Sequence, residues 1–363
     1  MKFRNFKLVG FVVYGRGSFD QLDEIISTQR KNNAPIIFLI DHFFSTGNIE
    51  QKKSLVNRIP LRGKDKILFA DVTHEPKTSY VDSLVNQLKD EFGTIAGIVG
   101  IGGGSTMDLA KAVSLMMNNP GSSADYQGWD LVKNPGVYKV GVPTLSGTGA
   151  EVSRTCVLTG PTKKLGMNSD FTPFDQIILD PELTTNAPFN QRFYTGMDCY
   201  IHCIESLNGT YLNEFSKSYG EKALELCREV FVEKNNWDDD CDNKLMMASY
   251  AGGMSIAYSQ VGVAHAVSYG LSYLLGTKHG VGNCIVFDKL EEFYPDGVKE
   301  FKFMVKKNKI DIPQNVTLGL TDKQFNTMID VSLGMGPLWE NALGKEWEKK
   351  MTREKLRALF GRL

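Results

Sequence analysis

The first half of the chain alternates short apolar runs with longer polar segments. The runs at 34–41, 66–72 and 94–104 have the length and the β-branched content of buried strands. Between them, segments 17–32 and 79–93 carry apolar residues at helical spacing. Strands that alternate with helices form parallel sheets, because each parallel strand needs a crossover connection. We therefore predict an N-terminal α/β domain with a Rossmann-like parallel sheet.

The second half has a different texture. Long segments rich in Ala, Leu, Met, Glu and Lys, such as 215–236 and 242–260, indicate helices. Two prolines and several small polar residues interrupt the pattern at 179–190. We predict a dinucleotide-binding α/β domain at 1–185 and an all-α, metal-binding domain at 186–363.

Charge and cysteine usage restrict the class of protein. Lys and Arg total 41 and Asp and Glu total 42, for a formal net charge of −1, and no long basic run would follow a phosphate backbone. Nucleic acid is therefore not an expected partner. Arg16 and Asp20 interrupt the apolar N-terminal stretch, so we predict neither a signal peptide nor a membrane span. The six cysteines form no C-x-x-C pair, which is typical of a cytoplasmic protein.

A glycine-rich loop follows the third apolar run. Three consecutive glycines let backbone N–H groups approach an anion, and a helix N-terminus attracts phosphate. Ser105 or Thr106 could cap the helix that follows. A structural turn would need only one or two glycines, so we interpret the loop as a pyrophosphate site made by Gly102, Gly103, Gly104 and Ser105.

A second loop, at 142–153, again follows a short apolar run. It contains hydroxyl side chains that could bind a phosphate or ribose, although such loops are also common turns. Two loops at strand ends of one sheet would place a ligand in the crevice there. The hydroxyl side chains are those of Thr144, Ser146 and Thr148.

An acidic residue ends the first apolar run. Asp41 could accept a hydrogen bond from the ribose 2′-OH of NAD and would repel the 2′-phosphate of NADP. It could equally cap a helix or occupy a turn.

Four residues of the second half suggest a metal site. Asp198 and His202 are four apart in a helical segment and therefore project from one face. The pair alone more often makes a surface hydrogen bond than a metal site. His265 lies in a segment almost free of charge, and His279 follows just past a turn. A carboxylate with three imidazoles suits Zn, Fe or Ni, so we predict a four-ligand site.

Taken together and in order, the motifs of this chain resemble those of the iron-containing (group III) alcohol dehydrogenase family. The resemblance covers residues from about 10 to 290. The motifs are Gly102–Ser105 with Asp108 and Lys111, then 143–151, 178–184, 196–206, 262–271 and 278–283.

The resemblance implies a metal-dependent dehydrogenase or oxidase acting on CH–OH groups. It implies Fe2+ or Zn2+ held by Asp198, His202, His265 and His279, and NAD(P) bound by the two loops together with Asp108 and Lys164. The acidic residue at position 41 implies NAD rather than NADP. Members commonly form homo-oligomers and act on small molecules.

Three features depart from the family pattern. The region beyond 300 is short and highly charged, so we expect the family's usual C-terminal helices to be trimmed. Tyr269 stands where many members carry a further histidine thought to assist proton transfer, so Tyr269 becomes the candidate catalytic residue, with water as the alternative proton relay. Glu75–Pro76 replaces the usual Asn-Pro, which puts one cofactor contact in question. These features resemble the 3-deoxy-D-manno-octulosonate (Kdo) 8-oxidase branch. That branch oxidises a sugar alcohol for a pyridoxal-phosphate aminotransferase in lipopolysaccharide biosynthesis.

Three other functions remain open from the sequence. The chain could be a generic NAD-dependent alcohol or diol dehydrogenase. It could be a lyase of the dehydroquinate-synthase type, which also uses NAD and a divalent metal but characteristically includes a glutamate ligand. It could also be a scaffold that binds metal or nucleotide without catalysis.

Overall fold

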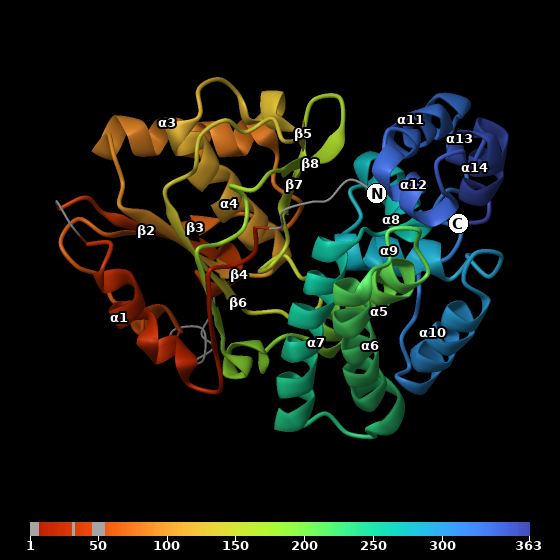
Figure 1. Cartoon of the computed structure of the whole chain (residues 1–363), viewed down its shortest axis with the longest axis horizontal. Helices are drawn as coiled ribbons and strands as arrows, with labels where there is room; N and C mark the ends of the chain where they lie inside the picture. The colour runs from red at the N-terminus through yellow and green to blue at the C-terminus, as the bar shows by residue number, and fades with distance from the viewer. Residues whose placement is uncertain (1–6, 31–32, 46–54) are drawn as a thin grey trace. The chain divides into compact units, whose positions relative to one another are not determined.

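The computed structural model describes residues 7–30, 33–45 and 55–363. The chain divides into two compact units (Figure 1). One comprises Met1–Leu145 and Ala150–Ala187, and the other comprises Ser146–Gly149 and Pro188–Leu363. The short segment Ser146–Gly149 thus packs with the second unit although the strands on both sides of it belong to the first.

The first unit is built on a six-stranded sheet in which every neighbouring pair is parallel. The predicted parallel sheet is therefore confirmed. In spatial order the strands are β1 (Phe11–Tyr14), β9 (Gln176–Leu179), β6 (Tyr138–Pro143), β4 (Gly97–Gly102), β2 (Ile36–Asp41) and β3 (Lys66–Ala70).

Helices cover both faces of this sheet. Val99 and Ile101 of β4 pack in one apolar cluster with Leu22 of α1 (Leu22–Ser27). Gly100 faces the other way, where an added Cβ would lie 2.6 Å from Cβ of Ala110 in α4 (Gly104–Asn118). Helix α3 (Thr78–Phe92) packs beside α4. A sheet buried on both faces explains why its strands are continuous apolar runs.

A second, three-stranded sheet in the first unit was not anticipated from the sequence. Its order is β5 (Gly128–Trp129), β8 (Lys164–Asn168) and β7 (Thr155–Thr159). Strands this short, with mixed composition, carry no clear period-2 pattern. The unit also contains the short 3-10 helices η1 (Ser18–Gln21), η2 (His42–Phe44), η3 (Ser123–Tyr126) and η4 (Pro181–Thr184).

The second unit is helical, as predicted. Its central helix, α5, is buried along almost its whole length. The helices are α5 (Phe189–Leu207), α6 (Glu214–Arg228), the π-helical turn η5 (Glu229–Glu233), α7 (Asp239–Tyr258), α8 (Val263–Leu275), α9 (His279–Phe287), α10 (Pro295–Lys307), α11 (Asp322–Leu333), α12 (Gly336–Leu343), α13 (Trp347–Lys350) and α14 (Arg353–Phe360).

The expectation that the C-terminal helices are trimmed is wrong. Five helices, α10 to α14, follow residue 294. In α10 the buried residues Val298, Phe301 and Met304 recur every three positions, so the charges occupy the exposed face of an amphipathic helix. Asn341 of α12 donates hydrogen bonds to the carbonyls of Gln260 and Val261, directly before α8. None of the described helices is long and apolar enough to cross a membrane.

Candidate active site

The first candidate residues lie where the strand order of the large sheet reverses. The chain leaves β2 toward β3 on one side and leaves β4 toward β6 on the other. Such a switch point opens a crevice at the carboxyl ends of the strands, where α/β folds bind ligands. Asp41 ends β2 and Gly102 ends β4. A Cβ on Gly102 would lie 3.0 Å from Cβ of Asp41, so the two predicted nucleotide residues are neighbours.

Asp41 also has a local structural role. Its carboxylate accepts a hydrogen bond of 2.9 Å from the backbone N–H of Phe43 and caps η2. This is the helix-cap alternative considered from the sequence. This role is compatible with a contact to a ribose hydroxyl, because a carboxylate accepts up to about four hydrogen bonds.

The glycine loop runs into α4 without a side-chain cap. The N-cap residue is Gly103, and Ser105 lies inside the helix. The expectation that Ser105 or Thr106 caps α4 is therefore wrong. The side chain of Thr106 packs instead under Gly102, where an added Cβ would be 2.3 Å from Thr106 Oγ1. First-turn N–H groups without a capping side chain are suited to an anion.

The second loop is attached to the first. The N–H of Thr144 donates to the carbonyl of Gly102 over 2.9 Å. Ser146 is buried, and its Oγ has no hydrogen-bond partner among the described residues. Thr148 is half-buried. An added Cβ at Gly147 would lie 1.8 Å from the carbonyl oxygen of Thr195, so this loop rests directly on α5.

Asp108 and Lys164 belong to a partly buried charged cluster that also includes Glu75. Lys164 Nζ lies 2.7 Å from Glu75 Oε1, and Asp108 accepts from the N–H of Val157 over 3.1 Å. Burial raises the pKa of Asp108 to about 7, against the opposing effect of the nearby Lys111 ammonium. Glu75, the residue that departs from the family pattern, is thus the ion-pair partner of a predicted nucleotide residue.

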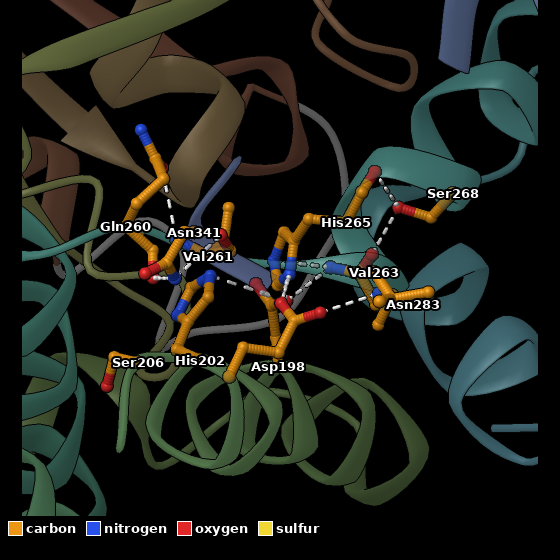
Figure 2. Close-up of polar contacts among 12 residues, drawn as sticks. Asp198, His202, Ser206, Gln260, Val261, Val263, His265, Ser268, Asn283 and Asn341 are labelled. Carbon is orange, nitrogen blue, oxygen red and sulfur yellow. Dashed lines mark hydrogen bonds and ion pairs between the residues drawn. The ribbon is translucent and has the colours of Figure 1, made fainter. Parts of the chain in front are cut away.

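The four predicted metal ligands converge in the second unit. Asp198 and His202 come from α5, His265 from α8 and His279 from the first position of α9. Figure 2 shows Asp198, His202 and His265 pointing toward one another. The Nε2 atoms of His202, His265 and His279 lie 3.7, 3.4 and 3.6 Å from the nearer carboxylate oxygen of Asp198. One potential ligand atom from each residue lies within 4.8 Å of all the others.

This geometry fits a divalent cation. Bonds of about 2.1 Å in a tetrahedron separate neighbouring ligand atoms by about 3.4 Å, close to the observed distances. Oδ2 of Asp198 is fully buried and, among the described residues, has no hydrogen-bond partner. A buried carboxylate oxygen without a donor is unfavourable unless a cation compensates it.

The pKa values of the ligands reflect burial and mutual contact. Burial alone would raise the pKa of Asp198, but the neighbouring imidazoles hold it well below its usual range. Burial lowers the pKa of His202 to about 4, so this imidazole is neutral at pH 7. At His265 the effect of burial is outweighed by the carboxylates of Glu205 and Asp198, which raise its pKa to about 9.

Two further residues contact the ligands and were missed in the sequence. Glu205 Oε2 lies 2.5 Å from His265 Nδ1. Asn283 donates from Nδ2 to Asp198 Oδ1 over 2.6 Å, and its Oδ1 accepts from the hydroxyl of Ser268. Both residues are buried. Helical spacing contained a signal, since Glu205 follows Asp198 by seven positions and Asn283 follows His279 by four.

Tyr269 lies on α8 one turn beyond His265. It is half-buried, and its ring centroid is 6.0 Å from that of His279. His279 is the most exposed of the four ligands, with 22% of its side chain accessible against 3% or less for the others. The exposed side of the centre is therefore the side near Tyr269.

The first unit has a parallel sheet with a glycine loop at its switch point, which is suited to a dinucleotide. The second unit has a carboxylate and three imidazoles, which are suited to a metal ion. Together they are typical of a metal- and dinucleotide-dependent class of oxidoreductase. Sequence comparison specifies the class further. The model of iron-containing alcohol dehydrogenase matches residues 10–181, and that of the Fe-containing alcohol dehydrogenase family, C-terminal, matches residues 192–328. The chain belongs to the iron-containing alcohol dehydrogenase family and is an oxidoreductase of the alcohol dehydrogenase type.

Individual relatives agree with this assignment. The chain is 23% identical to alcohol dehydrogenase 4 of Schizosaccharomyces pombe, over 98% of this chain and 88% of that protein. It is 29% identical to the NAD-dependent methanol dehydrogenase of Bacillus methanolicus, over 77% of this chain and 73% of that protein. The metal and nicotinamide cofactors expected from the sequence agree with these findings.

The fold is shared with solved structures. Sulfoacetaldehyde reductase from Bifidobacterium kashiwanohense, in complex with NAD+, superposes with a TM-score of 0.80 at 20% identity. The match covers 99% of this chain and 98% of that one. At this identity the likeness concerns the fold alone.

Proposed function

We propose that the protein oxidises a primary alcohol to an aldehyde and transfers a hydride to a nicotinamide dinucleotide, with NAD preferred over NADP. The convergence of one buried carboxylate and three imidazoles is the observation that carries this proposal. In a family of alcohol dehydrogenases, such a group is expected to take part in the reaction itself.

The roles of the ligands follow from their positions. Asp198, His202, His265 and His279 would hold Fe2+ or Zn2+, since imidazole and carboxylate ligands suit both ions. The cation would supply Lewis-acid activation of the alcohol oxygen, and the nicotinamide would accept the hydride. The alcohol would approach from the side of His279, because the other three ligands are enclosed by protein.

The nucleotide site would be formed by the residues at the switch point. The N–H groups at the start of α4 and of the glycine loop would bind the pyrophosphate. Asp41 would accept from the ribose 2′-OH, which excludes a 2′-phosphate by charge repulsion. Thr144, Ser146 and Thr148 would supply hydroxyl groups, and the buried Oγ of Ser146 is available for this purpose. Asp108 and Lys164 would contribute to nucleotide binding indirectly, as members of the charged cluster that includes Glu75.

Proton transfer is assigned to Tyr269. Its phenol would hold a proton at Oη and pass it between the alcohol and solvent, because the ring lies on the exposed side of the centre beside His279. Tyr269→Phe should therefore lower kcat while metal content stays normal. Normal kcat in this variant would assign proton transfer to water.

For the substrate, we propose the C8 hydroxyl of Kdo as the first compound to test. The support is the sequence resemblance and the tyrosine at position 269. A pyridoxal-phosphate aminotransferase would then use the aldehyde. Simple alcohols and diols are the alternative substrates.

The decisive assay follows NADH formation and aldehyde product with Kdo, 1,3-propanediol and methanol, using protein of known metal content. His265→Ala should abolish both metal retention and NADH formation. Full activity with normal metal content in that variant would disprove the site. A lyase of the dehydroquinate-synthase type would show no net conversion of NAD to NADH.

We also infer that the protein is cytoplasmic and forms homo-oligomers. All six cysteines are buried and free, which supports a reducing compartment. Sedimentation analysis would test the oligomeric state.

A further inference from the structure

Glu205 lies on the same face of α5 as Asp198 and His202 but is outside the group of four ligands. Its carboxylate is almost completely buried. Each oxygen has its own contact. Oε2 lies 2.5 Å from Nδ1 of His265, and Oε1 accepts from the backbone N–H of Ala264, also over 2.5 Å. A buried carboxylate with two such contacts is held in one orientation.

The contact with His265 determines which ring nitrogen carries the proton. An ionised carboxylate can only accept hydrogen bonds, so Nδ1 of His265 must be the donor. In the neutral ring Nε2 then carries the lone pair. Nε2 is the atom that lies 3.4 Å from Asp198. Glu205 therefore favours the tautomer in which the lone pair of His265 is on Nε2 and points to the metal site, where Asn283 Nδ2 also lies 3.0 Å from Nε2.

The contact with Ala264 fixes the start of α8. This helix has Gly262 as its N-cap and no side-chain cap from that residue. Glu205 supplies the missing acceptor, and Tyr294 Oη accepts from the preceding N–H, of Val263, over 3.4 Å. A Cβ at Gly262 would lie 2.7 Å from Tyr294 Oη, so the turn is tightly enclosed. Figure 2 shows the ring of His265, from α8, directed toward Asp198 of α5.

These two contacts join the helices that carry three of the four ligands. Asp198 and His202 are on α5 and His265 is on α8. We propose that Glu205 is a positioning residue of the metal centre, which sets both the tautomer of His265 and the placement of α8 against α5. The inference rests on the proposed metal site. Outer carboxylates of this kind change metal affinity by about 10- to 100-fold when removed.

Glu205→Gln is the sharpest test, because both groups that face position 205 are donors. A glutamine presents one oxygen and one NH2 group, so one of its two contacts would bring donor against donor. If the glutamine oxygen keeps the hydrogen bond from the N–H of Ala264, its NH2 group faces Nδ1 of His265. Nδ1 must then accept, which favours the tautomer with its proton on Nε2. Metal dissociation into excess chelator should then be about 10- to 100-fold faster. Glu205→Asp retains an acceptor and should recover part of the loss.

Tyr294→Phe is the matched control. It removes the other acceptor at the start of α8 and does not touch His265. It should leave the rate of metal loss within about twofold of the original protein, whatever its effect on melting temperature. Equal acceleration in Tyr294→Phe and Glu205→Gln would show that Glu205 only caps the helix, and would overturn the proposal.

A second readout needs no metal. Nitrogen chemical shifts of 15N-labelled histidine in the metal-free protein, recorded at a pH at which the rings are neutral, report the tautomer of each ring. His265 should change from the Nδ1–H to the Nε2–H form in Glu205→Gln, and an unchanged tautomer would refute the proposal. The metal site itself is tested separately by His265→Ala. If that variant retains metal while Glu205→Gln still changes the tautomer, the metal assignment fails and the positioning contact stands.

Discussion

Among single methyl groups added to the second loop, at 142–153, the one in Gly147→Ala should destabilise the folded protein most. Gly147 has φ +143°, a conformation that side chains rarely adopt. The added Cβ would lie 1.8 Å from the carbonyl oxygen of Thr195, where contacts under 3.0 Å essentially never occur. Loop and helix must therefore separate by about 1.2 Å or more, which costs about 1–3 kcal/mol or more, in addition to about 1 kcal/mol of backbone strain.

The control separates these two costs. Gly15 has nearly the same φ, +142°, but a Cβ there would meet nothing within 4 Å. Gly15→Ala should thus lose about 1 kcal/mol, and Gly147→Ala about 3 kcal/mol. For units of this size the melting temperature should fall by about 3 °C and about 10 °C respectively, as measured by circular dichroism.

The site gives this prediction a functional readout. Thr195 lies one turn before Asp198 on α5. A displaced loop would therefore also shift α5, which carries two of the proposed metal ligands, and the hydroxyl groups of the loop itself. Weaker retention of metal and weaker NADH binding should accompany the loss of stability in Gly147→Ala alone. Equal melting temperatures in the two variants would refute the claim that this loop is seated on α5.

Three further predictions concern charge and metal. Removing metal with a chelator should lower the melting temperature, because a cation at 100 times its Kd stabilises the folded state by about 2.7 kcal/mol; no change would exclude a resident ion. Burial raises the pKa of Asp108 to about 7, so between about pH 4 and 7 the folded chain binds a proton that the unfolded chain releases. The contribution of Asp108 to the free energy of unfolding should therefore fall as pH rises through this window, measured as the difference between urea titrations of the original protein and of the Asp108→Asn variant. An identical pH profile of the two proteins would contradict the assignment. Glu75→Gln should destabilise the protein by about 3 kcal/mol, because it removes the carboxylate charge that lies 2.7 Å from the buried Lys164 ammonium. The double variant Glu75→Leu/Lys164→Met should recover most of this loss in the same titration.

Features that depend on a local pattern of side chains could be predicted from the sequence. The strands β2 and β4 appear as apolar runs because the sheet is covered on both faces, and the glycine loop follows directly from its composition. The small sheet of β5, β8 and β7 was not predictable, since strands of two to five residues carry too little periodicity. The C-terminal region was misjudged because its many charges drew attention away from buried apolar positions, such as Val298, Phe301 and Met304 of α10.

The candidate site shows the same division. The spacing of Asp198 and His202 by itself places both side chains on one helical face, because four residues make about one turn. Only the tertiary structure brings His265 and His279 to that face, and only it pairs Glu75 with Lys164. The tautomer of His265 depends on Glu205, a residue 60 positions away in the chain. Side-chain chemistry and local periodicity are properties of the sequence, whereas hydrogen bonds between distant residues exist only once α5 and α8 have packed together.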